Sequence, residues 1–208
     1  IHITRISSAS SLEMIVAARA SGIAATCDIS INHLHLSDAD IGYFNPHARF
    51  VPPLRDRRDC DALRSGLAGG AINALCSDHA PVDDDAKQAP FGEAAPGATG
   101  LELLLPLTLK WAGEMKLPLG QALARITSDA ARVLGLAAGT LAVGAVADVC
   151  IFDPRGSFRV TRESLRSQGK NTPFLGQELP GRVCCTLIEG HVAFENEVSE
   201  KTHARLRV

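Results

Sequence analysis

Strand-like and helix-like segments alternate along the first third of the chain, and this alternation limits the possible folds more than any other feature. β-branched and polar residues alternate over 1–7, and apolar residues recur at helical spacing over 10–20. A second strand is expected over 23–29, a short amphipathic helix over 59–67 and a buried strand over 71–76. Strands that alternate with helices form parallel sheets, so we expect an α/β fold.

In the remainder of the chain, the sequence pattern changes from helix-like to strand-like at Gly135. Before it, the apolar pattern over 101–134 predicts three helices, the last with Ser128 as its N-cap. After it, short segments rich in Gly and Val predict strands at 147–152, 182–189 and 191–195. The sequence therefore divides into an α/β part at 1–135, a C-terminal β appendage at 136–197 and a charged tail at 198–208.

The composition is that of a soluble globular protein and excludes two classes of partner. With 21 Lys and Arg against 23 Asp and Glu, and no run of like charges, the chain offers no stripe that could bind nucleic acid. No apolar stretch reaches the roughly 18 residues that a membrane-spanning helix needs. The six cysteines lie mostly in apolar segments without zinc-finger spacing. We expect a cytoplasmic protein whose cysteines are buried, reduced thiols.

Asp78 is the sharpest candidate for chemistry. It directly follows the predicted strand over 71–76, and Pro81 prevents that strand from continuing. Barrel enzymes place functional groups at the carboxyl ends of their strands, where a carboxylate can carry a proton or bind a metal ion. The alternative is a strand-end aspartate that only caps the next turn. Local sequence leaves both interpretations open.

His33 and His35 form a second candidate, because an HxH pair on a strand points both imidazoles to one face and can bind zinc. They lie in 30–56, a segment that shows little periodicity and contains the turn-forming residues Asn45, Pro46, Pro52 and Pro53. This segment is predicted to be a long loop. Ordinary loop histidines are therefore the favoured interpretation. His2 and His79 are single histidines, which are more often hydrogen-bonded structural residues than ligands.

Short motifs follow one another in a fixed order along nearly the whole chain. They occupy 26–40, 52–55, 77–81, 97–102, 147–154 and 171–174. Together they resemble the C-terminal half of a dihydroorotase of the cyclic amidohydrolase family. The resemblance implies the last three strands of a metal-dependent-hydrolase TIM-type barrel plus a small β-sandwich-like appendage, with the N-terminal half of the family fold absent from this chain. It also implies zinc-activated hydrolysis of a cyclic amide.

The sequence departs from the family pattern at the positions that should carry this chemistry. Arg5 stands where the resemblance places a metal-binding histidine, and a guanidinium has no lone pair to offer a zinc ion. Val51 and Val82 replace an asparagine and a histidine expected beside the substrate ring. Asp78 matches the family's catalytic carboxylate. Among these site positions, it is the one residue that could still bind a metal ion.

These departures lead to three hypotheses. The first is a non-catalytic subunit of pyrimidine biosynthesis without a cofactor, which joins an oligomer with the catalytic subunit of aspartate transcarbamoylase and with its own N-terminal half. The second is an active zinc-dependent dihydroorotase, which interconverts dihydroorotate and carbamoyl aspartate with Asp78 as general base or metal ligand. The third is a divergent amidohydrolase acting on another ring.

Overall fold

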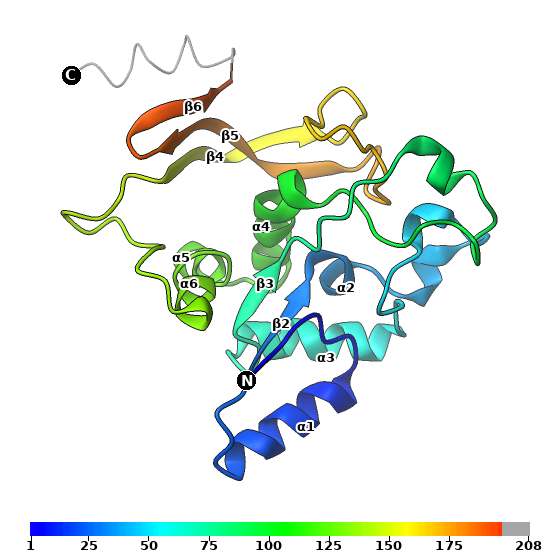
Figure 1. The fold of residues 1–208 in the computed structure, drawn as a ribbon, viewed down its shortest axis with the longest axis horizontal. Helices are drawn as coiled ribbons and strands as arrows, with labels where there is room; N and C mark the ends of the chain where they lie inside the picture. The colour runs from blue at the N-terminus through cyan, green and yellow to red at the C-terminus, as the bar shows by residue number, and fades with distance from the viewer. Residues whose placement is uncertain (197–208) are drawn as a thin grey trace.

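A computed structural model describes residues 1–196 of the chain, which form two separate sheets joined by helices (Figure 1). The strands are β1 (His2–Ile3), β2 (Thr26–Ser30), β3 (Ala74–Cys76), β4 (Val149–Arg159), β5 (Glu178–Ile188) and β6 (His191–Glu195). The α-helices are α1 (Ala9–Ala20), α2 (Ile31–His35), α3 (Arg57–Ala68), α4 (Leu104–Glu114), α5 (Leu119–Ala124) and α6 (Ser128–Leu134). The predicted tail at 198–208 lies outside the described residues.

The first sheet is parallel, with strand order β1-β2-β3. Helix α1 connects β1 to β2, and α3 lies between β2 and β3 in the chain, with α1 and α3 packed against each other. The α/β prediction is therefore confirmed. The observed strands are shorter than predicted, since β2 begins at Thr26 and β3 at Ala74. Their carboxyl ends lie at one edge of the sheet, where functional groups of α/β folds are found.

Helix α3 shows how local sequence sets an element and its packing. The Asp56 side chain accepts a hydrogen bond from the backbone N–H of Asp59, and Gly69 ends the helix. Between these ends, Cys60, Leu63 and Leu67 recur at helical spacing and are buried. Fully burying a leucine side chain contributes about 1.5–3 kcal/mol, so this stripe fixes the helix against the core.

The segment predicted as a long loop at 30–56 contains helix α2, so the prediction is wrong for 31–35, whereas 36–56 contains no α-helix or strand. The Ser30 side chain accepts a hydrogen bond from the backbone N–H of His33 and starts the helix directly at the end of β2. Five residues are too few to show helical periodicity. The predicted N-cap of α6 is also wrong, because Ser128 is the first helical residue and Thr127 precedes it as the cap.

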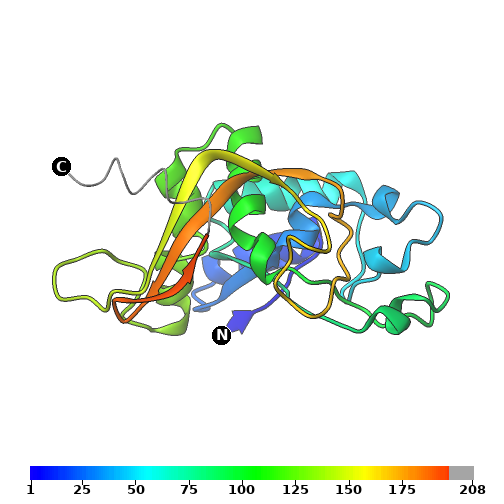
Figure 2. The same cartoon turned by 90° about the horizontal axis from the view of Figure 1, so that it is seen from above.

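The second sheet is antiparallel, with order β4-β5-β6, so all three predicted C-terminal strands are present. Figure 2 shows β4 and β5 running as a long twisted ribbon beside α4. A Cβ atom on Gly181 of β5 would lie 2.2 Å from Leu109 Cδ1 of α4, which shows how closely the sheet approaches that helix. Within residues 1–196 this is one three-stranded sheet, so the predicted sandwich of two sheets is not confirmed.

The cysteine prediction is correct in part. All six thiols are free, and Cys27 and Cys60 are buried. Cys150 is exposed, because β4 turns most of its residues to solvent. In the described part of the chain, no helix combines the length and apolar character needed to cross a membrane.

Candidate functional site

Asp78 lies just beyond the carboxyl end of β3, as the sequence predicts. Its backbone adopts a left-handed conformation with φ +46°, which aspartate tolerates better than most residues. The side chain is only 11% exposed. A carboxylate this deeply set needs a partner, because an unpaired buried charge is costly.

Arg5 is that partner. It follows β1, and its Nη1 atom donates to Asp78 Oδ1 at 3.0 Å and to the Val51 carbonyl oxygen at 3.3 Å. The structure thus brings Arg5, Asp78 and Val51 together across segments that are far apart in the sequence. The residue in the predicted metal-ligand position binds the predicted catalytic carboxylate directly.

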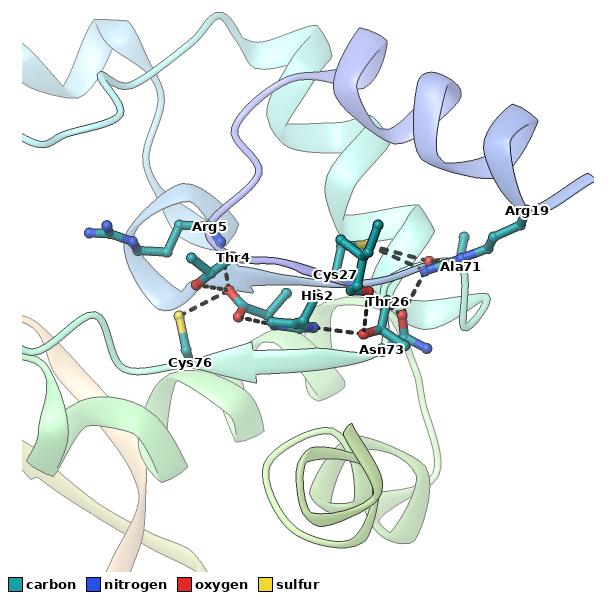
Figure 3. Close-up of polar contacts among 11 residues, drawn as sticks. His2, Thr4, Arg5, Arg19, Thr26, Cys27, Ala71, Asn73 and Cys76 are labelled. Atoms are coloured by element: carbon teal, nitrogen blue, oxygen red, sulfur yellow. Dashed lines mark hydrogen bonds and ion pairs between the residues drawn. The ribbon is translucent and has the colours of Figure 1, made fainter. Parts of the chain in front are cut away.

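Asp28 anchors the backbone next to this ion pair. It is a buried residue of β2, and its carboxylate is 2.8 Å from His2 Nε2 and accepts the Arg5 backbone N–H at 2.8 Å. Thr4 Oγ1 and Cys76 Sγ donate to the same carboxylate at 3.3 and 3.4 Å. Figure 3 shows Cys76 on β3 opposite His2 and Thr4, with dashed lines to the carboxylate between them, while the Arg5 side chain extends away from this cluster. Asp28 therefore fixes the point from which the Arg5 side chain reaches Asp78.

Asp28 was not predicted as a site residue, although its position in the sequence carries a recognisable signal. Asp28 is a carboxylate inside the apolar segment predicted as a strand over 23–29, and a charged residue in such a position needs partners in the fold. Its neighbour Cys76 responds to the same environment, since burial and the Asp28 carboxylate raise the pKa of the Cys76 thiol. The thiol stays protonated and serves as a hydrogen-bond donor.

His33 and His35 do not form a metal-binding pair. His33 contacts Ser30 Oγ through Nδ1 at 2.9 Å and the Pro52 carbonyl oxygen through Nε2 at 3.1 Å, while His35 Nε2 lies 2.9 Å from the Leu107 carbonyl oxygen. Burial lowers the pKa of His33, and it lowers the pKa of His35 to about 4. Both are neutral structural histidines, as favoured from the sequence, but they belong to a helix rather than a loop.

Asn171 supports the segment that follows Asp78. Its Nδ2 atom donates to the Ala80 carbonyl oxygen at 3.0 Å, and its Oδ1 atom accepts the Val82 backbone N–H at 3.0 Å. His79 Nδ1 accepts the backbone N–H of Gly100 at 3.2 Å, so this histidine is structural too. Asn171 belongs to the recognised motif at 171–174, but its spacing gave no indication of which segment it would contact.

The residues that this chain contributes do not fit a zinc ion. Arg5 offers no lone pair, and its guanidinium already donates to the Asp78 oxygen that could bind a metal ion. Among residues 1–196, no group of three or more His, Cys, Asp or Glu side chains is arranged to hold a metal ion. The site as built is an ion pair.

Comparison with known proteins places these observations in a family. The sequence pattern of the amidohydrolase family matches residues 4–194. A dihydroorotase-like protein of Pseudomonas aeruginosa is 42% identical over 194 residues, which cover 93% of this chain and 46% of that protein. A dihydroorotase of Geobacter sp. is 38% identical over 195 residues, covering 94% of this chain and 46% of that protein.

A solved structure gives the same result for the fold. The L-hydantoinase (dihydropyrimidinase) of Arthrobacter aurescens superposes with a TM-score of 0.86 at 28% identity, covering 93% of this chain and 44% of that protein. The chain thus spans about half the length of the curated relatives it matches. Its parallel sheet, its Asp78 at a strand end and the match over nearly all of its residues lead to one conclusion: the chain belongs to the amidohydrolase family.

Proposed function

We propose that this chain is part of a dihydroorotase-like protein of pyrimidine biosynthesis that acts as a non-catalytic subunit and supports assembly of the catalytic subunit of aspartate transcarbamoylase. The ion pair between Arg5 and Asp78 is the observation that carries the proposal. A catalytic carboxylate must be free to exchange a proton with substrate or water. Here its Oδ1 atom accepts a hydrogen bond from a permanently charged guanidinium.

The two substituted substrate positions support the same proposal. The Val51 carbonyl oxygen accepts from Arg5, and the Val82 backbone N–H donates to Asn171. Their side chains are apolar and offer a cyclic amide no hydrogen bond. A polar group of a ligand that is buried without a partner costs about 1–3 kcal/mol, which would weaken binding of a polar ring at these positions.

The partner and location follow from the resemblance and from the thiols. A subunit that keeps its core but not its site chemistry can still offer surfaces for an oligomer, here proposed to contain the aspartate transcarbamoylase catalytic subunit and the N-terminal half of the family fold. All six cysteines are free, which is typical of proteins in a reducing compartment. We therefore propose a cytoplasmic location.

An active zinc-dependent dihydroorotase is the second candidate. Two observations favour it: Asp78 is retained at the strand end, and a relative at 38% identity carries the name dihydroorotase. In that case Asp78 would act as general base on dihydroorotate or carbamoyl aspartate. Arg5 would first have to release it, and any zinc would depend on ligands from outside this chain.

One experiment separates the two candidates. Dihydroorotase turnover and the size of the complex with aspartate transcarbamoylase are measured for the intact protein, for Asp78→Ala and for Asp38→Ala, which removes an exposed carboxylate elsewhere. The proposal expects no turnover in any of them and an unchanged complex in both variants. Turnover in the unsubstituted protein that survives in Asp38→Ala but disappears in Asp78→Ala would overturn it. Two stoichiometric zinc ions per subunit would contradict the conclusion that the site does not fit zinc.

A further inference from the structure

A cavity of about 580 Å³ lies between the second sheet and the start of α4, and its lining includes none of the residues of the Arg5–Asp78 site. Glu102 and Pro106 border it on the side of α4, and Phe158 and Phe194 border it on the side of the sheet. The segment 163–166 closes another side. Small-molecule sites in proteins commonly measure about 300–1,000 Å³, so the cavity is large enough for a ligand.

The wall formed by this segment is held in place by two charged side chains. The Glu102 carboxylate accepts the backbone N–H groups of Arg166 at 2.5 Å and Ser167 at 2.7 Å. Lys170 Nζ donates to the Leu165 carbonyl oxygen at 2.5 Å, and the Leu165 side chain is 3% exposed. Because these contacts fix the backbone, the cavity exists before any ligand binds, and a ligand would not have to order it.

Two guanidinium groups in the lining lack an acidic partner within the described residues. Arg166 lies over the Phe194 ring, with 5.8 Å between its Cζ atom and the ring centroid. Arg182 has no hydrogen bond or ion pair through its guanidinium with any residue of 1–196. Other polar groups of the lining are already bonded, since Glu102 binds backbone N–H groups, Ser157 Oγ donates to Glu178 and Asn196 Nδ2 donates to the Val183 carbonyl oxygen. The Glu163 carboxylate also borders the cavity, but it is exposed to solvent and hydrogen-bonded to Thr161. The charged groups of the lining that have neither an acidic partner nor a hydrogen bond within the described residues are therefore the guanidinium groups of Arg166 and Arg182.

The rest of the wall is apolar and partly aromatic. Pro106, Phe158, Leu165 and Val183 contribute to it, together with the Phe194 ring. Guanidinium groups bind carboxylates and phosphates through paired hydrogen bonds, and rings pack well against flat apolar bodies. We propose that this cavity is a binding site for a small organic anion, with a flat apolar body between the rings and a carboxylate or phosphate group on Arg182 and Arg166.

The test uses the intact protein and the fluorescent aromatic anion 8-anilinonaphthalene-1-sulfonate. We expect saturable binding that benzoate, phenyl phosphate or both displace and that neutral benzamide does not. The more effective competitor identifies the preferred head group. No saturable binding, or displacement by benzamide as effective as that by the two anions, would overturn the proposal.

Variants locate the bound anion. Arg182→Gln should raise the dissociation constant about tenfold, as expected when one charge-assisted hydrogen bond is lost, and Val183→Trp should abolish binding by filling the cavity. Arg159→Gln is the matched control, because Arg159 lies on the same sheet outside the lining. Asp78→Ala should leave binding unchanged, which separates this site from the proposed function. Thermal unfolding checks that each variant folds, and equal affinities for Arg182→Gln and Arg159→Gln would overturn the proposal.

Discussion

Replacing Asp28 by alanine should destabilise the protein far more than replacing a surface aspartate. The Asp28 carboxylate is a shared contact of three parallel strands, since His2 lies on β1, Cys76 on β3 and Asp28 itself on β2. It also accepts the backbone N–H of Arg5. Alanine would leave this N–H and the His2 ring without their acceptor in a partly buried place, and it would loosen the backbone that directs Arg5 toward Asp78.

The expected loss can be worked from the contacts. The two bonds at 2.8 Å, which the carboxylate accepts from His2 Nε2 and from the Arg5 backbone N–H, are the strong ones; each bond to a charged group contributes about 1.5–3 kcal/mol. Part of this is offset, because removing the carboxylate also removes its desolvation cost. We expect a loss of about 3 kcal/mol for Asp28→Ala. Asp28→Asn retains an oxygen for the Arg5 N–H and should lose about 1 kcal/mol.

Thermal unfolding of the intact protein measures both losses. A loss of about 3 kcal/mol lowers the midpoint temperature by about 6–12 °C when the unit that unfolds cooperatively has about 150–250 residues. Asp61→Ala is the control, because Asp61 is 57% exposed and pairs with Arg57 on the surface of α3; it should change the free energy of unfolding by less than about 1 kcal/mol. If Asp28→Ala lowers the midpoint no more than Asp61→Ala does, the role assigned to Asp28 is wrong.

Two further predictions concern His35 and Gly181. Burial lowers the pKa of His35 to about 4, so its contribution to stability is complete above the unfolded pKa of about 6.5 and is lost as pH falls from there toward the folded value. His35→Gln, whose amide can still donate to the Leu107 carbonyl oxygen, should flatten this part of the pH–stability curve in urea unfolding, and an unchanged slope would contradict the assignment. Gly181→Ala should cost about 2–4 kcal/mol, since its Cβ would lie 2.2 Å from Leu109 Cδ1 at φ +86°. Gly176→Ala, at φ +82° in open space, should cost only about 1–2 kcal/mol, and equal losses would show that the contact with α4 is not tight.

The parts of the fold that depend on local sequence could be predicted. Helix α3 has a capping aspartate, an apolar stripe and a glycine at its end, all within its own residues. Strands β4, β5 and β6 were recognised from short segments rich in Gly and Val, although β4 and β5 extend beyond the predicted bounds. Helix α2 was missed because its start depends on one side-chain bond from Ser30 rather than on a repeating pattern.

The contacts of the site could not be predicted in the same way. Asp78 was placed correctly at a strand end, and Arg5 was recognised as unable to bind a metal ion. That the two side chains meet depends on β1 and β3 lying on opposite sides of β2, and on Asp28 holding the Arg5 backbone. Arg5 and Asp78 are 73 residues apart in the chain, and no local sequence pattern predicts a contact over that separation.

The ion pair also changes what the presence of Asp78 means. In an amidohydrolase site, a carboxylate at this strand end is readily taken as evidence of catalysis. Here the side chain is 11% exposed, so a carboxylate without a partner would be destabilising. Arg5 supplies that partner, and Asp78 in turn neutralises a guanidinium whose other described contact is the uncharged Val51 carbonyl oxygen. Each residue thus gives a physical reason for the other, so the presence of Asp78 is not by itself evidence of catalysis.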